Sequence, residues 1–313
     1  MSKLPFRGGG VKVEKMNYHQ PVMGPECIEG LTIQPNGIYV DATFGGGGHS
    51  RLILNELDKG QLFGFDQDED SLQNIPNDER FTFNHHNFRY LKQFLKLHGV
   101  RQVDGILADL GVSSHQLDEA KRGFSFRYDA DLDMRMNQQD EVTAADILNS
   151  YTTEKLQEIF SKYGEVRNAK TLSQRIAQER GVRPIKTIGE FLSIIEPLIR
   201  GHRGRYLAQV FQALRIEVND EMGALEAFLK STLDVLKPDG RLVIETYHSI
   251  EDRVVKNFLK TGNVQGEVIK DDYGNIDRPF KLINRKPILP SKEEIKINPR
   301  SRSAKLRIAS KRV

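Results

Sequence analysis

Four side chains that can bind a ligand or move a proton stand at the ends of short apolar stretches. Asp41, Asp66 and Asp109 each end one such stretch, and His248 ends another. A run of four glycines, residues 45–48, follows the first stretch. Carboxylates accept hydrogen bonds from hydroxyl and amino groups, and a glycine backbone lets a ligand approach closely. If these stretches are neighbouring parallel strands, the four side chains meet in one crevice.

The glycine run predicts a ligand-binding turn between a strand and a helix. It lies in residues 37–50 (GIYVDATFGGGGHS), and a flexible loop is the alternative. Such a turn aims free N–H groups of the helix start at a ligand. Asp66 follows about twenty residues later, where an acid binds a ribose diol in nucleotide-binding folds. We therefore expect a nucleoside-containing cofactor.

The type of cofactor is less clear from this turn alone. A dinucleotide fingerprint would need Gly or Ala where Ser50 stands, which weighs against an oxidoreductase. The acidic loops favour a cofactor with a positive centre, such as S-adenosylmethionine. Asp66, Asp68 and Asp70 alternate like ion ligands, but the position after a strand favours the ribose role for Asp66. We predict no metal site.

Strands alternate with helices in the first third of the chain, and the strand pattern returns near its end. This alternation predicts an α/β fold with a parallel sheet covered on both faces. Helical spacing without a clear strand fills residues 115–215, which predicts an inserted helical domain. The expected strands are residues 38–42, 61–66, 80–84, 103–109, 241–248 and 305–309; the expected helices of the insert are 154–163, 167–180 and 187–200.

Composition limits the class of protein. The single cysteine, Cys27, excludes an intrachain disulfide and fits a reducing cytoplasm; we expect it in the core. No apolar run approaches the roughly 20 residues of a membrane span, and we expect no signal peptide. The net charge of +3 is mild, but both ends of the chain are basic, which suggests contact with a phosphate backbone. We expect residues 1–17 to be flexible.

Several longer motifs resemble one known family. They are residues 104–118 (DGILADLGVSSHQLD), 122–126 (RGFSF), 132–136 (LDMRM), 211–221 (FQALRIEVNDE), 248–253 (HSIEDR) and 298–307 (NPRSRSAKLR). In this order they are similar to the bacterial 16S ribosomal RNA cytosine-N4 methyltransferase family (RsmH, formerly MraW). The resemblance runs from about His19 to the C-terminus. It departs at His115, where the family commonly has Pro, and at Tyr247, where it commonly has Phe.

The resemblance implies a Rossmann-like, class I S-adenosylmethionine-dependent methyltransferase domain over residues 18–114 and 216–313. It also implies that the helical insert, residues 115–215, recognises RNA. The implied reaction is methylation of the N4 amine of cytidine 1402 in 16S rRNA of the small ribosomal subunit, in the cytoplasm. The family's cofactor positions fall on Gly47, Gly48, His49, Asp66, Phe88, Asp109 and Gln116.

The amine of cytosine is a poor nucleophile, because its lone pair is delocalised into the ring. An enzyme must align it with the methyl group and accept its N–H hydrogens. Asp109 is the first candidate acceptor, with Ser113 and Ser114 nearby, although Asp109 could equally serve the cofactor. His248 could orient the base or take a late proton, or it could be a structural histidine.

Three segments could contact RNA: residues 122–127, 200–205 and 298–307. The first interleaves arginines with Phe124 and Phe126, which could instead anchor the loop in the core. The rival functions are a methyltransferase of the same fold acting on another nucleic acid or on protein, and a non-enzymatic RNA-binding assembly factor. The chain could act as a monomer or a homodimer.

Overall fold

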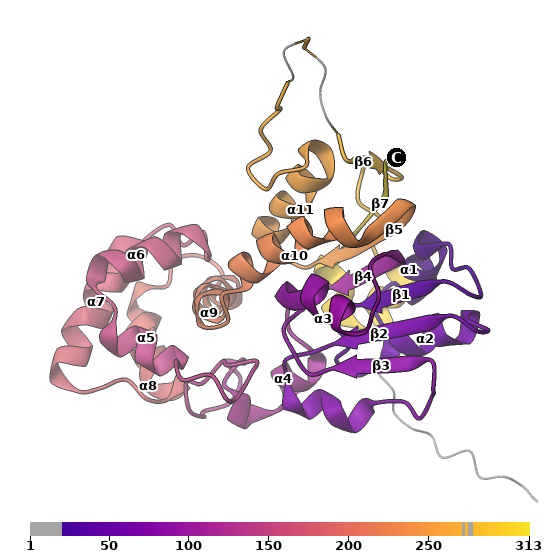
Figure 1. The fold of residues 1–313 in the computed structure, drawn as a ribbon. Helices are drawn as coiled ribbons and strands as arrows, with labels where there is room; N and C mark the ends of the chain where they lie inside the picture. Colours follow the sequence, from indigo (N-terminus) through magenta and orange to yellow (C-terminus); the bar gives the residue numbers. More distant parts are fainter. Residues whose placement is uncertain (1–20, 271–272, 275–277) are drawn as a thin grey trace, which may run out of the picture.

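The computed structural model describes residues 21–270, 273–274 and 278–313; the expected flexible segment, residues 1–17, lies outside them. The described chain forms a sheet covered by helices, with a group of further helices on one side of it (Figure 1). Within the described residues no helix is both long and apolar enough to cross a membrane.

One seven-stranded sheet runs through the molecule in the order β3-β2-β1-β4-β5-β7-β6. Its strands are β1 (Ile38–Asp41), β2 (Gln61–Phe65), β3 (Phe81–Asn84), β4 (Val103–Asp109), β5 (Leu236–Thr246), β6 (Phe280–Leu282) and β7 (Lys305–Lys311). Strands β1 to β5 are parallel, as predicted, but β7 pairs antiparallel with β5 and β6. The sequence does not predict β6, because three residues are too few to show an alternating pattern.

Both faces of the sheet are covered, so its central strands are buried on both sides. Helices α1 (Gly24–Leu31) and α2 (Gly48–Glu56) pack on one face. Helices α3 (Leu91–Leu97), α10 (Glu221–Val235) and α11 (Ser249–Thr261) pack on the other. Burial on both faces explains the continuous apolar strands that the sequence shows.

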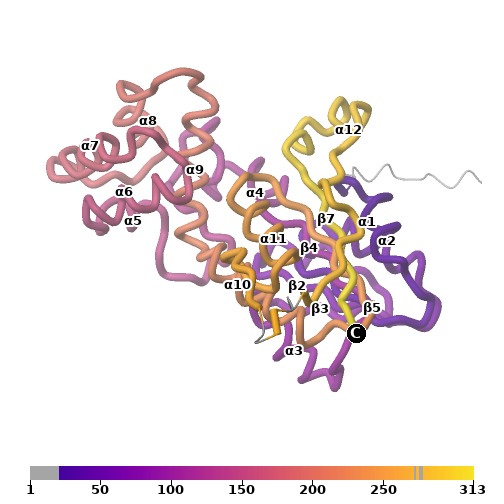
Figure 2. Tube along the Cα trace, turned by 90° about the horizontal axis from the view of Figure 1, so that it is seen from above, coloured from indigo at the N-terminus to yellow at the C-terminus, as the bar shows by residue number. Residues whose placement is uncertain are grey.

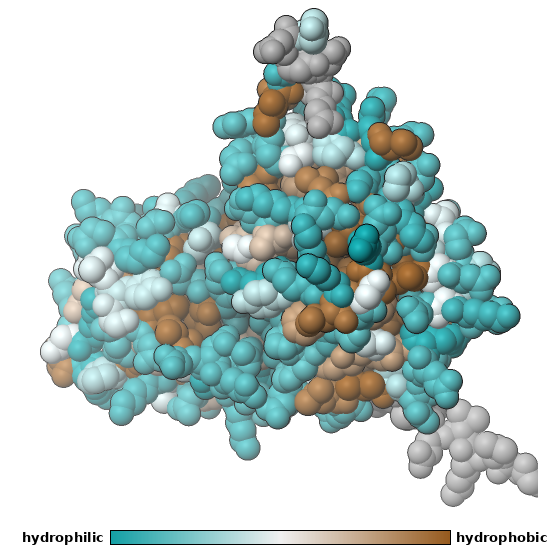
Figure 3. Space-filling view, viewed as in Figure 1, coloured by the Kyte–Doolittle hydropathy of each residue, from teal (hydrophilic) through white to brown (hydrophobic). Residues whose placement is uncertain are grey.

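The chain between β4 and α10 folds mostly into helices that share a separate apolar core. They are α4 (Ser114–Asp118), α5 (Ala144–Ser150), α6 (Thr153–Lys162), α7 (Ala169–Val182), α8 (Ile188–Ile195) and α9 (Arg203–Val218). Hydrophilic residues cover most of the face shown in Figure 3, with apolar residues between them. The sequence does not predict α9, which continues past residue 215. The domain limits given above stay a prediction.

Helix α12 (Lys292–Ile297) lies beside the start of α1 (Figure 2). The Glu294 side chain on α12 accepts a hydrogen bond of 2.8 Å from the backbone N–H of Met23. The C-terminal part of the chain therefore packs against the first helix of the described structure, close to the glycine turn.

Candidate active site

A cavity of about 1030 Å³ opens between the carboxyl ends of the parallel strands and the helical segment. Its lining includes the predicted site residues Gly48, His49, Asp66, Phe88, Asp109, Ser113, Gln116 and His248, but not Gly47. Side chains of the helical segment, among them those of Phe124, Phe211 and Arg215, complete its wall. Sequence reasoning missed the wall from α9, because it did not predict that helix.

The glycine turn needs glycine for its backbone conformation. Gly45 and Gly47 have φ values of +50° and +72°, in the left-handed region that other residues rarely adopt. A side chain at Gly46 would meet no atom within 4 Å, so the backbone there borders open space. The turn leads directly into α2, which begins at Gly48.

Asp66 follows β2 and holds the glycine turn in place. Its carboxylate accepts hydrogen bonds from the backbone N–H groups of Gly45 (2.7 Å) and Asp68 (2.8 Å). Burial raises the pKa of Asp66 to about 6, although these two hydrogen bonds oppose the rise. Asp66 is therefore mostly ionised at neutral pH and can accept hydrogen bonds from a ligand.

Ser113 and Gln116 form a capping box at the start of α4. The Ser113 hydroxyl accepts a hydrogen bond from the Gln116 N–H, and the Gln116 carboxamide oxygen accepts one from the Ser113 N–H. The Gln116 amide group also donates to Asp68 at 2.6 Å. Both side chains line the cavity while their hydrogen bonds shape the loop after β4.

Asp109 ends β4 at the centre of the cavity wall, and its side chain is 26% exposed. The Tyr247 hydroxyl donates to its Oδ1 at 2.7 Å, and His49 Nδ1 lies 3.9 Å from its Oδ2. Burial raises the pKa of Asp109, and the contacts with His49 and Tyr247 lower it in part. The sequence places Tyr247 at the end of a strand that borders the crevice, but it did not assign a role to the hydroxyl.

His248 is the N-cap of α11 rather than the last residue of a strand, because β5 ends at Thr246. Its Nε2 lies 2.9 Å from Glu251 Oε1. Burial acts to raise the pKa of Glu251, but His248 and Arg215 outweigh it, so this pKa lies below its usual value. The ring is thus oriented by its own helix while it lines the cavity.

Two of the arginines proposed for RNA contact form buried ion pairs within the protein. Arg122 is buried and forms ion pairs with Asp68 and Asp70. Arg307 is buried and pairs with Asp252 at 2.7 Å. The expectation that these two guanidinium groups face RNA is wrong, because partners distant in sequence neutralise them.

The two phenylalanines beside Arg122 act as anchors. Phe124 is buried, and Phe126 packs edge-to-face on Phe211 with ring centroids 5.5 Å apart. Anchoring of this loop in the core is therefore the better of the two interpretations that the sequence left open.

The parallel sheet, the helices on both of its faces and the cavity at the carboxyl ends of its strands define a Rossmann-like α/β fold. The glycine turn follows β1, Asp66 follows β2, and Asp109 ends β4. The chain matches the MraW methylase family over residues 16–312 and belongs to it.

Curated relatives cover nearly the whole chain. Ribosomal RNA small subunit methyltransferase H of Bacteroides fragilis is 56% identical over 304 residues, which are 96% of this chain and 100% of the relative. The protein of the same name from Parabacteroides distasonis is 58% identical over 297 residues, 94% of this chain and 97% of the relative. The protein of that name from Flavobacterium johnsoniae is 53% identical over 298 residues, which are 95% of this chain and 98% of the relative.

Proposed function

We propose that this protein transfers a methyl group from S-adenosylmethionine to the N4 amine of cytidine 1402 in 16S rRNA of the small ribosomal subunit. Membership of the MraW methylase family and similarity to proteins named ribosomal RNA small subunit methyltransferase H support this proposal. The observation that carries it is that Asp66, Asp109 and His248 border one cavity with the glycine turn. Donor and base would meet there.

The residues of the cavity fit the donor. S-adenosylmethionine, when bound, supplies a methyl group on a positively charged sulfur. The backbone of Gly46 and Gly48 borders the cavity and can approach the methionine part, while the ionised Asp66 can accept hydrogen bonds from ribose hydroxyls. Phe88, held edge-on by Phe228 with centroids 5.2 Å apart, offers an apolar wall for adenine.

Gly47, His49 and Gln116 would act mainly by shaping the donor site. Gly47 sets the left-handed N-cap of α2, and Gln116 braces the loop after β4. The nitrogens of the His49 ring face Val22, Glu245 and Asp109. These contacts leave the His49 backbone and ring face for the donor.

Asp109 would accept an N–H of the cytosine amine, so that charge can build on the attacking nitrogen. The Tyr247 hydroxyl fixes Oδ1 of this carboxylate, which leaves Oδ2 to face the base. Ser113 could donate its free O–H to the base, and His248 could orient it or take the released proton. Positioning of this kind accounts for several kcal/mol of a transfer barrier.

The proposal is tested by methyl transfer from labelled S-adenosylmethionine to unmodified small ribosomal subunits, with free 16S rRNA and DNA alongside. We expect N4-methylcytidine at position 1402, and a far lower rate for the isosteric variant Asp109→Asn. Label in DNA or protein would refute the acceptor and keep the fold. Binding of RNA without any transfer would favour the assembly-factor alternative.

A further inference from the structure

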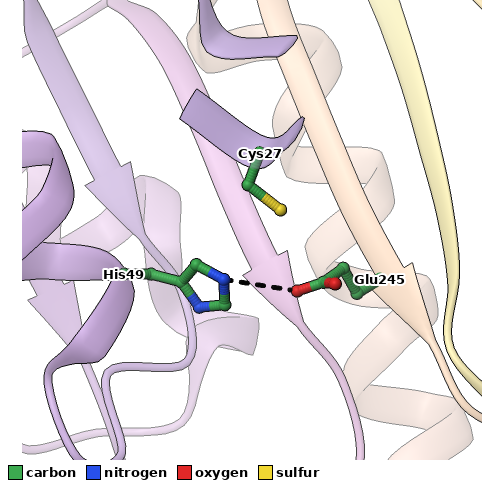
Figure 4. Close-up of side chains that lie close together, drawn as sticks. All are labelled: Cys27, His49 and Glu245. Atoms are coloured by element: carbon green, nitrogen blue, oxygen red, sulfur yellow. Dashed lines mark ion pairs between the residues drawn. The ribbon is translucent and has the colours of Figure 1, made fainter. Parts of the chain in front are cut away.

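Three potential metal ligands converge behind the cavity wall, next to its glycine turn. Cys27 comes from α1, His49 from the first turn of α2 and Glu245 from β5, and their side chains point toward one another (Figure 4). A sulfur, a ring nitrogen and a carboxylate oxygen of these residues all lie within 4.8 Å of one another. Cys27 and Glu245 are fully buried, and His49 is 5% exposed.

Glu245 is the unexplained member of this cluster. Neither of its carboxylate oxygens has a hydrogen-bond partner among the described residues, and His49 Nε2 is 3.4 Å away. The backbone of Glu245 pairs with β4 on one side and β7 on the other, which keeps its side chain on the covered face of the sheet, with Val243. A buried carboxylate without partners is strongly unfavourable, and burial accordingly raises the pKa of Glu245. Such a group either takes up a proton or binds a cation, and the sulfur and ring nitrogen beside it supply the further ligands that a cation needs.

We propose that Cys27 Sγ, His49 Nε2 and a Glu245 oxygen bind one zinc ion. Thiolate, imidazole and carboxylate are the three usual kinds of zinc ligand, with Zn–N and Zn–O distances of about 2.0–2.2 Å. In a tetrahedral site these distances put nitrogen and oxygen roughly 3.3–3.4 Å apart, and the structure has 3.4 Å. One thiolate and one carboxylate would also neutralise the charge of the ion inside the protein.

The surroundings of His49 fit this role. The Val22 carbonyl oxygen lies 3.0 Å from Nε2, close enough to fill or border a fourth ligand position. Zinc on Nε2 keeps the ring proton on Nδ1, which faces Asp109 Oδ2 at 3.9 Å. A histidine between a metal and a carboxylate is a common arrangement that fixes the ring and its tautomer. Zinc would thus hold His49 behind Asp109.

A second group with similar donors already contains a cationic side chain. Glu221, His248 and Glu251 also bring their donor atoms within 4.8 Å of one another. Arg215 Nε lies 2.7 Å from Glu221 Oε1, and Arg215 Nη2 lies 3.9 Å from Glu251 Oε1. A cation is therefore already in place there, whereas among the described residues no lysine or arginine pairs with Glu245, whose neighbours in the cluster are Cys27 and His49.

The test measures metal on the full chain, purified without a metal-affinity step and dialysed against zinc. We expect one zinc per chain by elemental analysis, and a thiolate-to-cobalt absorption band when cobalt replaces it. Cys27→Ala and Glu245→Gln should each bind zinc at least about 100-fold more weakly, because even indirect partners of a metal site change affinity 10–100-fold. Glu29→Gln, on the exposed side of α1, is the matched control and should bind normally.

Absence of retained zinc in the wild-type chain would overturn the proposal and leave a simple ion pair between His49 and Glu245. Equal affinity in all variants would overturn it too. If Cys27→Ala does not fold, the cobalt spectrum of the wild-type chain decides, because a bound cobalt without the thiolate band excludes Cys27. These measurements use neither S-adenosylmethionine nor RNA, so their outcome is independent of the proposed reaction.

Discussion

Replacing Asp66 with Asn should stabilise the ligand-free protein at neutral pH while weakening its binding of S-adenosylmethionine. Burial raises the pKa of Asp66 from 3.8 to about 6. A rise of about two units means that folding disfavours the charged form by about 3 kcal/mol. Asn removes the charge but can accept only part of the hydrogen bonding from Gly45 and Asp68. The expected net gain in the free energy of unfolding is about 1–2 kcal/mol.

The pH dependence is the sharper part of this prediction. As pH rises from 3.8 to about 6, Asp66 loses its proton in the unfolded chain before it does so in the folded one. The contribution of Asp66 to the free energy of unfolding of the wild-type protein is therefore lost across that pH window. Asn does not titrate, so the variant shows no such loss. The advantage of Asp66→Asn should be smallest near pH 4 and complete above pH 7.

Urea unfolding of both proteins at several pH values measures this difference, and a thermal shift with S-adenosylmethionine measures binding. Asp78→Asn is the control, and it should change the free energy of unfolding in the opposite direction. Its hydrogen bond with Arg80 lowers the pKa of Asp78, so its ionised form stabilises the fold above the usual carboxyl pKa. A variant Asp66→Asn that is less stable than wild type at pH 7.5, with the same difference at pH 4, would refute the reasoning.

Three further predictions concern groups around the cavity. Asp109→Asn should lower kcat by at least about 100-fold with little change in the dissociation constant of S-adenosylmethionine; weaker donor binding with unchanged kcat would assign Asp109 to the cofactor. Tyr247→Phe removes the hydroxyl that lowers the pKa of Asp109, so kcat/KM should fall about tenfold and the acid limb of the pH–rate profile should move to higher pH; an unmoved profile would contradict this. Arg122→Ala leaves Asp68 and Asp70 without their buried partner and should lower the free energy of unfolding by about 3–5 kcal/mol in urea; a loss below about 1 kcal/mol, as for a surface pair, would show the ion pairs to be unimportant.

The sequence by itself determined the alternation of strands and helices over β1 to β4 and the return of strands near the end of the chain. Apolar periodicity is a local property, set by which side chains must face a core, so it located β1 to β4 and the glycine turn to within one or two residues. It placed the start of β5 at residue 241, whereas the strand begins at Leu236. The glycine turn and Asp66 follow two strands that pair in the sheet, so their spacing along the chain already pointed to a nucleoside ligand. Helix α9 was not predicted, because the arginines at its start interrupt the apolar spacing of the side that the helical core buries.

Only the tertiary structure decided which charges are neutralised and which face the cavity. Arg122 looked free in the sequence, but its partners Asp68 and Asp70 lie more than fifty residues away along the chain. Cys27 and Glu245 likewise meet only because α1 packs on the strand that ends the parallel part of the sheet. The energy of a charged group depends on its burial and on the charges beside it, and folding sets both through contacts that no local pattern records.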